Sequence, residues 1–112
     1  MTAMPARTLA ALKASIMHWT ENVQAETPDQ TRLGQDHCAL CQAFPRVDCM
    51  GCPVMKKTGQ PGCDGSPYID VMDAHAWWED APDSPEARAE WVTAATAERD
   101  FLVSLLSEGE TP

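Results

Sequence analysis

The chain has 112 residues, which is the size of one domain, and a net charge of −9. Its apolar runs are too short to span a membrane and its N-terminus lacks the apolar core of a signal peptide, so we expect a cytoplasmic protein. Eleven acidic and two basic side chains fall within residues 69–112, and this negative charge disfavours nucleic acid as a partner.

A first helix is predicted over residues 5–25. Apolar residues recur there at steps of three and four: Leu9, Leu12, Ile16, Trp19 and Val23. Pro28 prevents the helix from continuing, and the polar residues 26–37 are expected to form a connector. His18 lies off the apolar face and is predicted to be at the surface.

A cysteine-rich centre is predicted over residues 37–66. Its many prolines and glycines fit neither a long helix nor a regular strand. We expect turns there, with room for one short β-hairpin.

A second helix is predicted over residues 67–80, with Ser66 as its N-cap and Pro67 at its first position. His75 is in the middle of its apolar face and is interpreted as a hydrogen-bonded core histidine, the alternative being a ligand or a hydrogen-bond donor to a metal site. Trp77 projects among aspartates. We expect either that another segment covers it or that it is exposed and anchors a partner. The apolar face contains Tyr68, Val71, Met72, His75, Ala76 and Trp78.

A third, acidic helix is predicted over residues 85–107, because Asp83-Ser84-Pro85-Glu86 supplies a cap, a proline and an acid in the first turn. Glu98 falls within its apolar stripe, where an unpaired carboxylate is costly, so we expect an ion pair. The available basic partners are Lys13, Arg88 and Arg99. The stripe itself contains Ala87, Trp91, Ala94, Ala95, Phe101, Leu102 and Leu105.

The cysteines predict a metal site. All five lie in the predicted centre: Cys38, Cys41, Cys49, Cys52 and Cys63. The first four form two C-x2-C pairs, a spacing that places two thiolates on one tetrahedral Zn²⁺. Five thiols exceed four positions, so Cys63 either replaces Cys49 or Cys52 or remains a spectator, and His37 is a further candidate ligand.

An iron–sulfur cluster is the alternative cofactor, because four cysteines also hold such clusters. The compact C-x2-C-x2-C spacing of ferredoxins is absent, which favours zinc. The sequence contains no H-x-E with P-C-x-x-C, no H-E-x-x-H, no phosphate-binding loop and no G-x-S-x-G. We therefore predict a structural zinc site in a protein that is not an enzyme.

Several segments together resemble a group of small cysteine-rich proteins of phages and prophages. The similarity covers roughly residues 9–68 and implies a small phage-associated metal protein in the cytoplasm of the host cell. The acidic helix from residue 83 onward lies outside it. The matching segments are Leu12-Lys13-x-Ser15-Ile16-x-His18-Trp19-x-Glu21-Asn22, Cys38-Ala-Leu-Cys41, Cys49-x-Gly-Cys52-Pro53-Val54, Thr58-Gly59 and Cys63-x-Gly-Ser66-Pro67-Tyr68.

These observations predict a mainly α domain of about three helices around a metal centre, acting as a protein–protein interaction module. Its acidic face would bind a basic host protein, for example a CRISPR or other defence complex, although plain solubility also explains the charge. The predicted contact residues are Asp70, Asp73, Trp77, Asp80, Asp83, Glu86 and Glu90. The alternatives are a nucleic-acid-binding regulator that uses Arg46, Lys56 and Lys57, and an iron–sulfur redox sensor.

Overall fold

The computed structural model describes residues 6–33 and 66–106. These residues form three α-helices and one short 3₁₀ helix, and they contain no strand, so the mainly helical fold is confirmed for this part of the chain. The predicted cysteine centre and the hairpin allowed there lie, apart from Ser66, outside the described residues. The elements are α1 (Ala6–Val23), η1 (Pro28–Gln30), α4 (Tyr68–Asp80) and α5 (Pro85–Val103).

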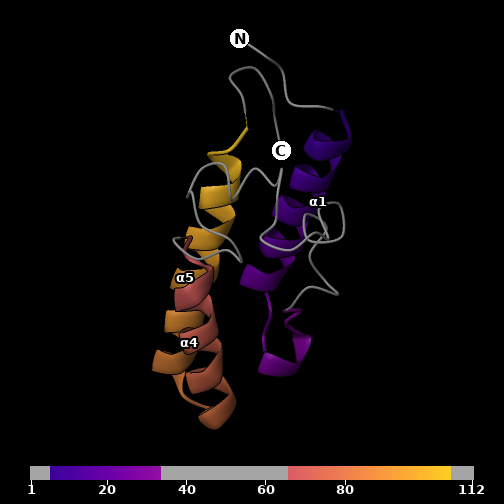
Figure 1. Cartoon of the computed structure of the whole chain (residues 1–112). Coiled ribbons are helices and arrows are strands. Elements are labelled where there is room, and N and C mark those ends of the chain that lie inside the picture. The colour runs from indigo at the N-terminus through magenta and orange to yellow at the C-terminus, as the bar shows by residue number, and fades with distance from the viewer. Residues whose placement is uncertain (1–5, 34–65, 107–112) are drawn as a thin grey trace, which may run out of the picture.

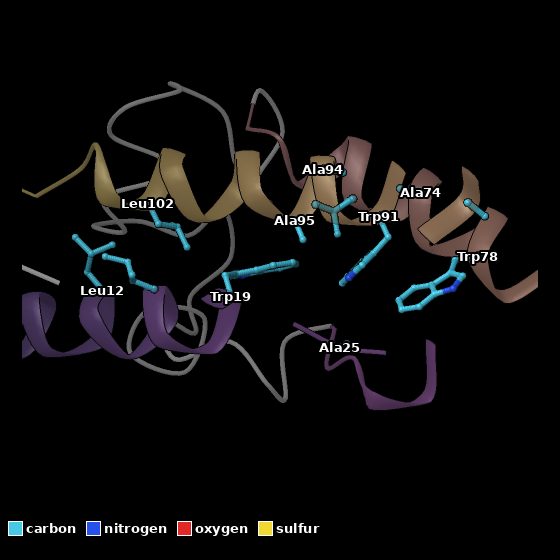
Figure 2. Packing of buried hydrophobic residues seen from close by; sticks show 12 residues of the cluster. Leu12, Trp19, Ala25, Ala74, Trp78, Trp91, Ala94, Ala95 and Leu102 are labelled. Carbon is cyan, nitrogen blue, oxygen red and sulfur yellow. The ribbon is translucent and has the colours of Figure 1, made fainter. Parts of the chain in front are cut away.

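Helix α5 is the central element, because both α1 and α4 pack against it (Figure 1). A short turn joins α4 to α5, so these two helices form an antiparallel hairpin (Figure 1). Helix α1 also lies along α5, with Leu12 facing Leu102 and Trp19 close to Ala95 (Figure 2). Helix α5 thus connects two parts of the fold that have few contacts with each other.

The core is built around Trp91 of α5, whose side chain is fully buried. Its ring centroid lies 6.3 Å from that of Trp19 in α1 and 5.8 Å from that of Trp78 in α4. Trp19, Trp78 and Trp91 are buried as the sequence predicts, whereas Tyr68 and Phe101 are half-buried against the edge of the same cluster. One aromatic side chain on the central helix therefore joins all three α-helices.

The helix ends follow the capping residues closely. Ser84 caps α5 as predicted: its hydroxyl oxygen accepts a hydrogen bond from the Ala87 amide at 3.1 Å. Pro67 rather than Ser66 is the cap of α4, although the Ser66 hydroxyl accepts from the Tyr68 amide at 3.2 Å. Helix α5 ends at Val103, before the predicted residue 107, because the chain tightens there into bonds between residues three apart.

The buried face of α4 is narrower than the predicted one. Met72 is 48% exposed and Ala76 is also exposed, whereas Ala74 is buried. The physical reason is that, among the described elements, α4 packs mainly against α5 and η1, so a single stripe of small and large residues meets the core. This stripe consists of Val71, Ala74 and Trp78.

None of the described helices is long and apolar enough to cross a membrane.

Candidate protein-binding groove

An open groove of about 420 Å³ lies between α4 and α5. Small side chains, Ala74 and Ala94, form its floor where the two helices meet, and the longer side chains stand on either side. Because the helices are antiparallel, Trp77 and Glu90 lie toward the connecting turn, and Asp70 and Ala97 lie toward the other end. The lining residues are Asp70, Asp73, Ala74, Trp77, Glu90, Thr93, Ala94 and Ala97.

Trp77 is the aromatic wall of this groove. Trp77 is 45% exposed, so no segment within residues 6–33 and 66–106 covers it as one of the two predicted arrangements requires. Ile69 and Met72 are the other large apolar residues of α4 that are exposed, at 47% and 48%. Helix α4 therefore presents both an indole ring and aliphatic side chains to solvent.

Among the described residues, no cation pairs with the carboxylates of the groove. Asp70 and Asp73 come from α4 and Glu90 comes from α5, and all three are exposed. Within residues 6–33 and 66–106, the ion pairs join His75 to Glu79 and Arg99 to Asp100, each at 3.0 Å. The groove consequently carries negative charge that no ion pair of the described fold neutralises.

The other predicted contact residues lie outside the groove. Asp80, Asp83 and Glu86 are exposed around the turn between α4 and α5. Glu86 accepts a hydrogen bond at 3.2 Å from the Ser84 hydroxyl, next to the start of α5. The structure thus brings Asp70, Asp73, Trp77 and Glu90 together and places the remaining three acids at one end of the hairpin.

His75 is held on both ring nitrogens by protein groups. Nδ1 lies 3.0 Å from a Glu79 carboxylate oxygen and Nε2 lies 2.8 Å from the Thr31 hydroxyl. The Thr31 hydroxyl in turn donates to the Pro28 carbonyl at 2.7 Å, so His75 belongs to a chain of polar contacts from Glu79 to the connector. The geometry is that of the predicted hydrogen-bonded core histidine.

The ring of His75 also packs edge-on against Trp91, with centroids 5.5 Å apart. Since Thr31 follows η1, this histidine links the connector after α1 to both helices of the hairpin.

The five cysteines, Cys38, Cys41, Cys49, Cys52 and Cys63, lie outside the described residues, as do His37, Arg46, Lys56 and Lys57. In the part of the chain that the structure describes, no group of three or more histidine, cysteine or acidic side chains is placed to hold a metal ion. The zinc site therefore stays a prediction from cysteine spacing.

Glu98 is buried in the stripe of α5, at 4% exposure, as the sequence predicts. Two of its three expected partners are engaged elsewhere. Arg99 pairs with Asp100 at 3.0 Å, and Arg88 donates to the Ala25 carbonyl at 3.4 Å. The buried position of Glu98 is thus as predicted, but Arg88 and Arg99 contact other groups. Glu98 has an interaction partner of its own.

Asn22 is a structural residue that sequence reasoning missed. Its side chain is 2% exposed and closes the connector: Oδ1 accepts from the Arg32 amide and Nδ2 donates to the Arg32 carbonyl, both at 3.1 Å. The backbone carbonyl of Asn22 also accepts from Trp91 Nε1 at 2.9 Å. A signal was present, because Asn22 lies three residues after Trp19 on the apolar stripe.

His18, which is predicted to be at the surface, is partly exposed and makes a contact that the sequence did not indicate. It is half-buried, and its Nε2 donates to the carbonyl of Arg32 at 2.8 Å. The connector folds back along α1, and this return, which helical periodicity does not encode, covers the ring.

Comparisons with protein-family models, with curated proteins and with solved structures found no match to this chain.

Proposed function

We propose that the protein is a non-enzymatic interaction module whose α4–α5 groove binds a basic surface of another protein. The observation that carries this proposal is that an exposed indole, Trp77, and three carboxylates, which no ion pair of the described residues neutralises, line one hollow. Exposed aromatic residues are preferred anchors of protein interfaces, and complementary charge speeds encounter and selects the partner. A face kept acidic only for solubility does not require an exposed tryptophan.

Zinc belongs to the same proposal as a structural component. Four of the five cysteines would hold one Zn²⁺, because thiolates in C-x2-C pairs are preferred zinc ligands. A closed four-thiolate site stabilises a small fold and leaves no open position for catalysis.

The resemblance to phage and prophage proteins suggests where the partner is found. A phage-encoded protein acts in the host cytoplasm, where defence complexes such as CRISPR effectors hold nucleic acid on lysine- and arginine-rich surfaces. Carboxylates on a rigid helical hairpin compete for such surfaces in place of phosphate. We propose a counter-defence inhibitor of this kind as the biological role.

The test compares two variants that remove equal charge from different places. The groove variant is D70N/D73N/E90Q, and the matched control is E21Q/E26Q/D29N, whose three acids are exposed on α1, η1 and the residues between them. Partners are captured from host extract and identified, and affinity is then measured with the purified partner at several salt concentrations. We expect the groove variant to lose about tenfold or more in affinity, because interface charges contribute to binding, and the control to change little.

Equal affinity for the wild-type protein and the groove variant would contradict the proposal. Circular dichroism of both variants establishes that the helices remain formed.

A further inference from the structure

The chemistry of the groove specifies which side chain it receives. We propose that the groove binds an arginine side chain from a basic segment of the partner, with the guanidinium stacked on Trp77 and paired with the carboxylates. This inference rests on the proposed function and narrows it to one kind of contact.

The groove combines an apolar floor with a charged rim. Ala74 and Ala94 are buried at the floor, while Asp73 and Glu90 are exposed on opposite helices. An arginine side chain complements this arrangement, because its aliphatic stem covers apolar surface while its charged head stays among polar groups. The volume of about 420 Å³ falls in the range of sites that enclose small ligands, roughly 300–1,000 Å³, so one long side chain and its flanking backbone fit.

Arginine fits this groove better than lysine. A guanidinium is planar and weakly hydrated, so it stacks on an indole face and donates two parallel hydrogen bonds to one carboxylate. A lysine ammonium is a compact and strongly hydrated point charge, which gains less from Trp77. The exposed indole beside Glu90 therefore predicts discrimination between the two cations.

The acids of the groove do not suit a metal ion as the occupant. They come from two helices, and among the described residues no group of three potential metal ligands is close enough to hold an ion. The rest of the lining includes apolar surface from Ala74, Trp77, Ala94 and Ala97. Metal sites gather oxygen ligands, whereas protein interfaces join apolar and charged surface in this way.

The experiment follows the indole N–H of Trp77 in the full chain by ¹H–¹⁵N NMR, with its signal assigned by loss in Trp77→Phe. The probes are a nine-residue Gly/Ser peptide with three arginines and its lysine and citrulline counterparts. We expect the arginine peptide to shift the Trp77 signal and to leave those of the buried Trp19, Trp78 and Trp91 in place. It should bind several-fold more tightly than the lysine peptide, and the uncharged citrulline peptide should not bind.

Two variants separate stacking from charge. Trp77→Ala should lower the affinity for the arginine peptide about tenfold, which is the contribution of a partly desolvated cation–π contact. It should also remove the preference for arginine over lysine. The double variant D73N/E90Q should lower the affinity for both cationic peptides, whereas the control E21Q/E26Q should change the affinity for neither.

Equal affinity for the arginine and lysine peptides, or an unmoved Trp77 signal, overturns the inference. If D73N/E90Q still weakens binding in that case, the acidic interface of the proposed function stands without the arginine contact. If neither cationic peptide binds at low salt, the inference is also overturned. In that case the proposed function would still be supported if the wild-type protein captures the purified partner and D70N/D73N/E90Q does not.

Discussion

The connector between α1 and the rest of the fold depends on one amide side chain. Asn22 satisfies both the N–H and the C=O of Arg32, and its own carbonyl receives the indole N–H of Trp91. A buried polar group that loses such partners costs more than an exposed one, because water does not replace them.

We predict that Asn22→Ala lowers the free energy of unfolding by about 2 kcal/mol, since it removes two hydrogen bonds and leaves the Arg32 N–H without its partner, while His18 still donates to the Arg32 carbonyl. Gln24→Ala is the matched control, because Gln24 is exposed two residues further along the chain. Urea unfolding measures both variants, and amide exchange at Arg32 should accelerate only in the first. Equal stability of the two variants would show that the connector does not depend on the Asn22 amide.

A comparison of Trp78 with Trp91 distinguishes the contribution of packing from that of hydrogen bonding. Both side chains are fully buried, but Trp91 Nε1 donates to the Asn22 carbonyl, while Trp78 Nε1 has no hydrogen-bond partner among the described residues. Replacement by phenylalanine removes a similar volume from each site, so the difference between the two variants reports the hydrogen bond.

We predict that Trp91→Phe is about 1 kcal/mol more destabilising than Trp78→Phe, because a buried hydrogen bond contributes roughly that amount. The free energy of unfolding of each variant is measured with urea. If Trp78→Phe is the more destabilising change, packing rather than the indole N–H decides the difference.

At the scale of elements, α5 is the helix on which the others depend. Both α1 and α4 pack against it, and its apolar stripe supplies Ala87, Trp91, Ala94, Ala95 and Leu102 to the core. Its start is defined by Ser84 and Pro85, an N-cap followed by a proline at the first helical position. Loss of order in this helix should therefore lower the stability of the whole described fold.

We predict that Ser84→Ala lowers the free energy of unfolding by about 1 kcal/mol, the usual contribution of an N-cap hydrogen bond. Ser84→Asn should retain most of it, because an asparagine side chain also caps helices. Thermal and urea unfolding followed by circular dichroism test both variants. A Ser84→Asn protein as unstable as Ser84→Ala would mean that the cap is not the cause.

At the scale of the whole molecule, the acidic charge and the predicted metal ligands belong to different segments. The acidic surplus lies in residues 69–112, and all five cysteines lie between residues 38 and 63. Helices α4 and α5 present the acidic face with its groove, and the proposed zinc would stabilise a separate, proline-rich segment. Binding and metal content should therefore be separable by mutation.

We predict one zinc per chain by elemental analysis of the native protein, because two C-x2-C pairs supply four thiolates. Serine replacement of Cys38, Cys49, Cys52 and Cys63 one at a time should abolish zinc in three variants and identify the spare cysteine. Chelation should lower the thermal midpoint of the wild-type protein, since metal affinity contributes to folding. Iron with acid-labile sulfide would instead establish a cluster protein.

The amino-acid sequence by itself determined where the helices lie and which tryptophans form the core. Apolar residues at steps of three and four, the Ser84-Pro85 start and the stop before Pro28 are local signals, so neighbours along the chain suffice to interpret them. It also placed Glu98 within a buried stripe. Each of these properties depends on helical geometry alone.

Only the tertiary structure decided which faces of the helices contact other elements and which remain exposed. Met72 and Ala76 are exposed because nothing among the described elements packs on that side of α4, and Trp77 is exposed for the same reason. The groove exists because α5 brings Glu90 to the same hollow as Asp73 and Trp77, and Asn22 is buried because the connector returns to it. These contacts join residues far apart in the chain, and periodicity carries no information about which distant surface a face will meet.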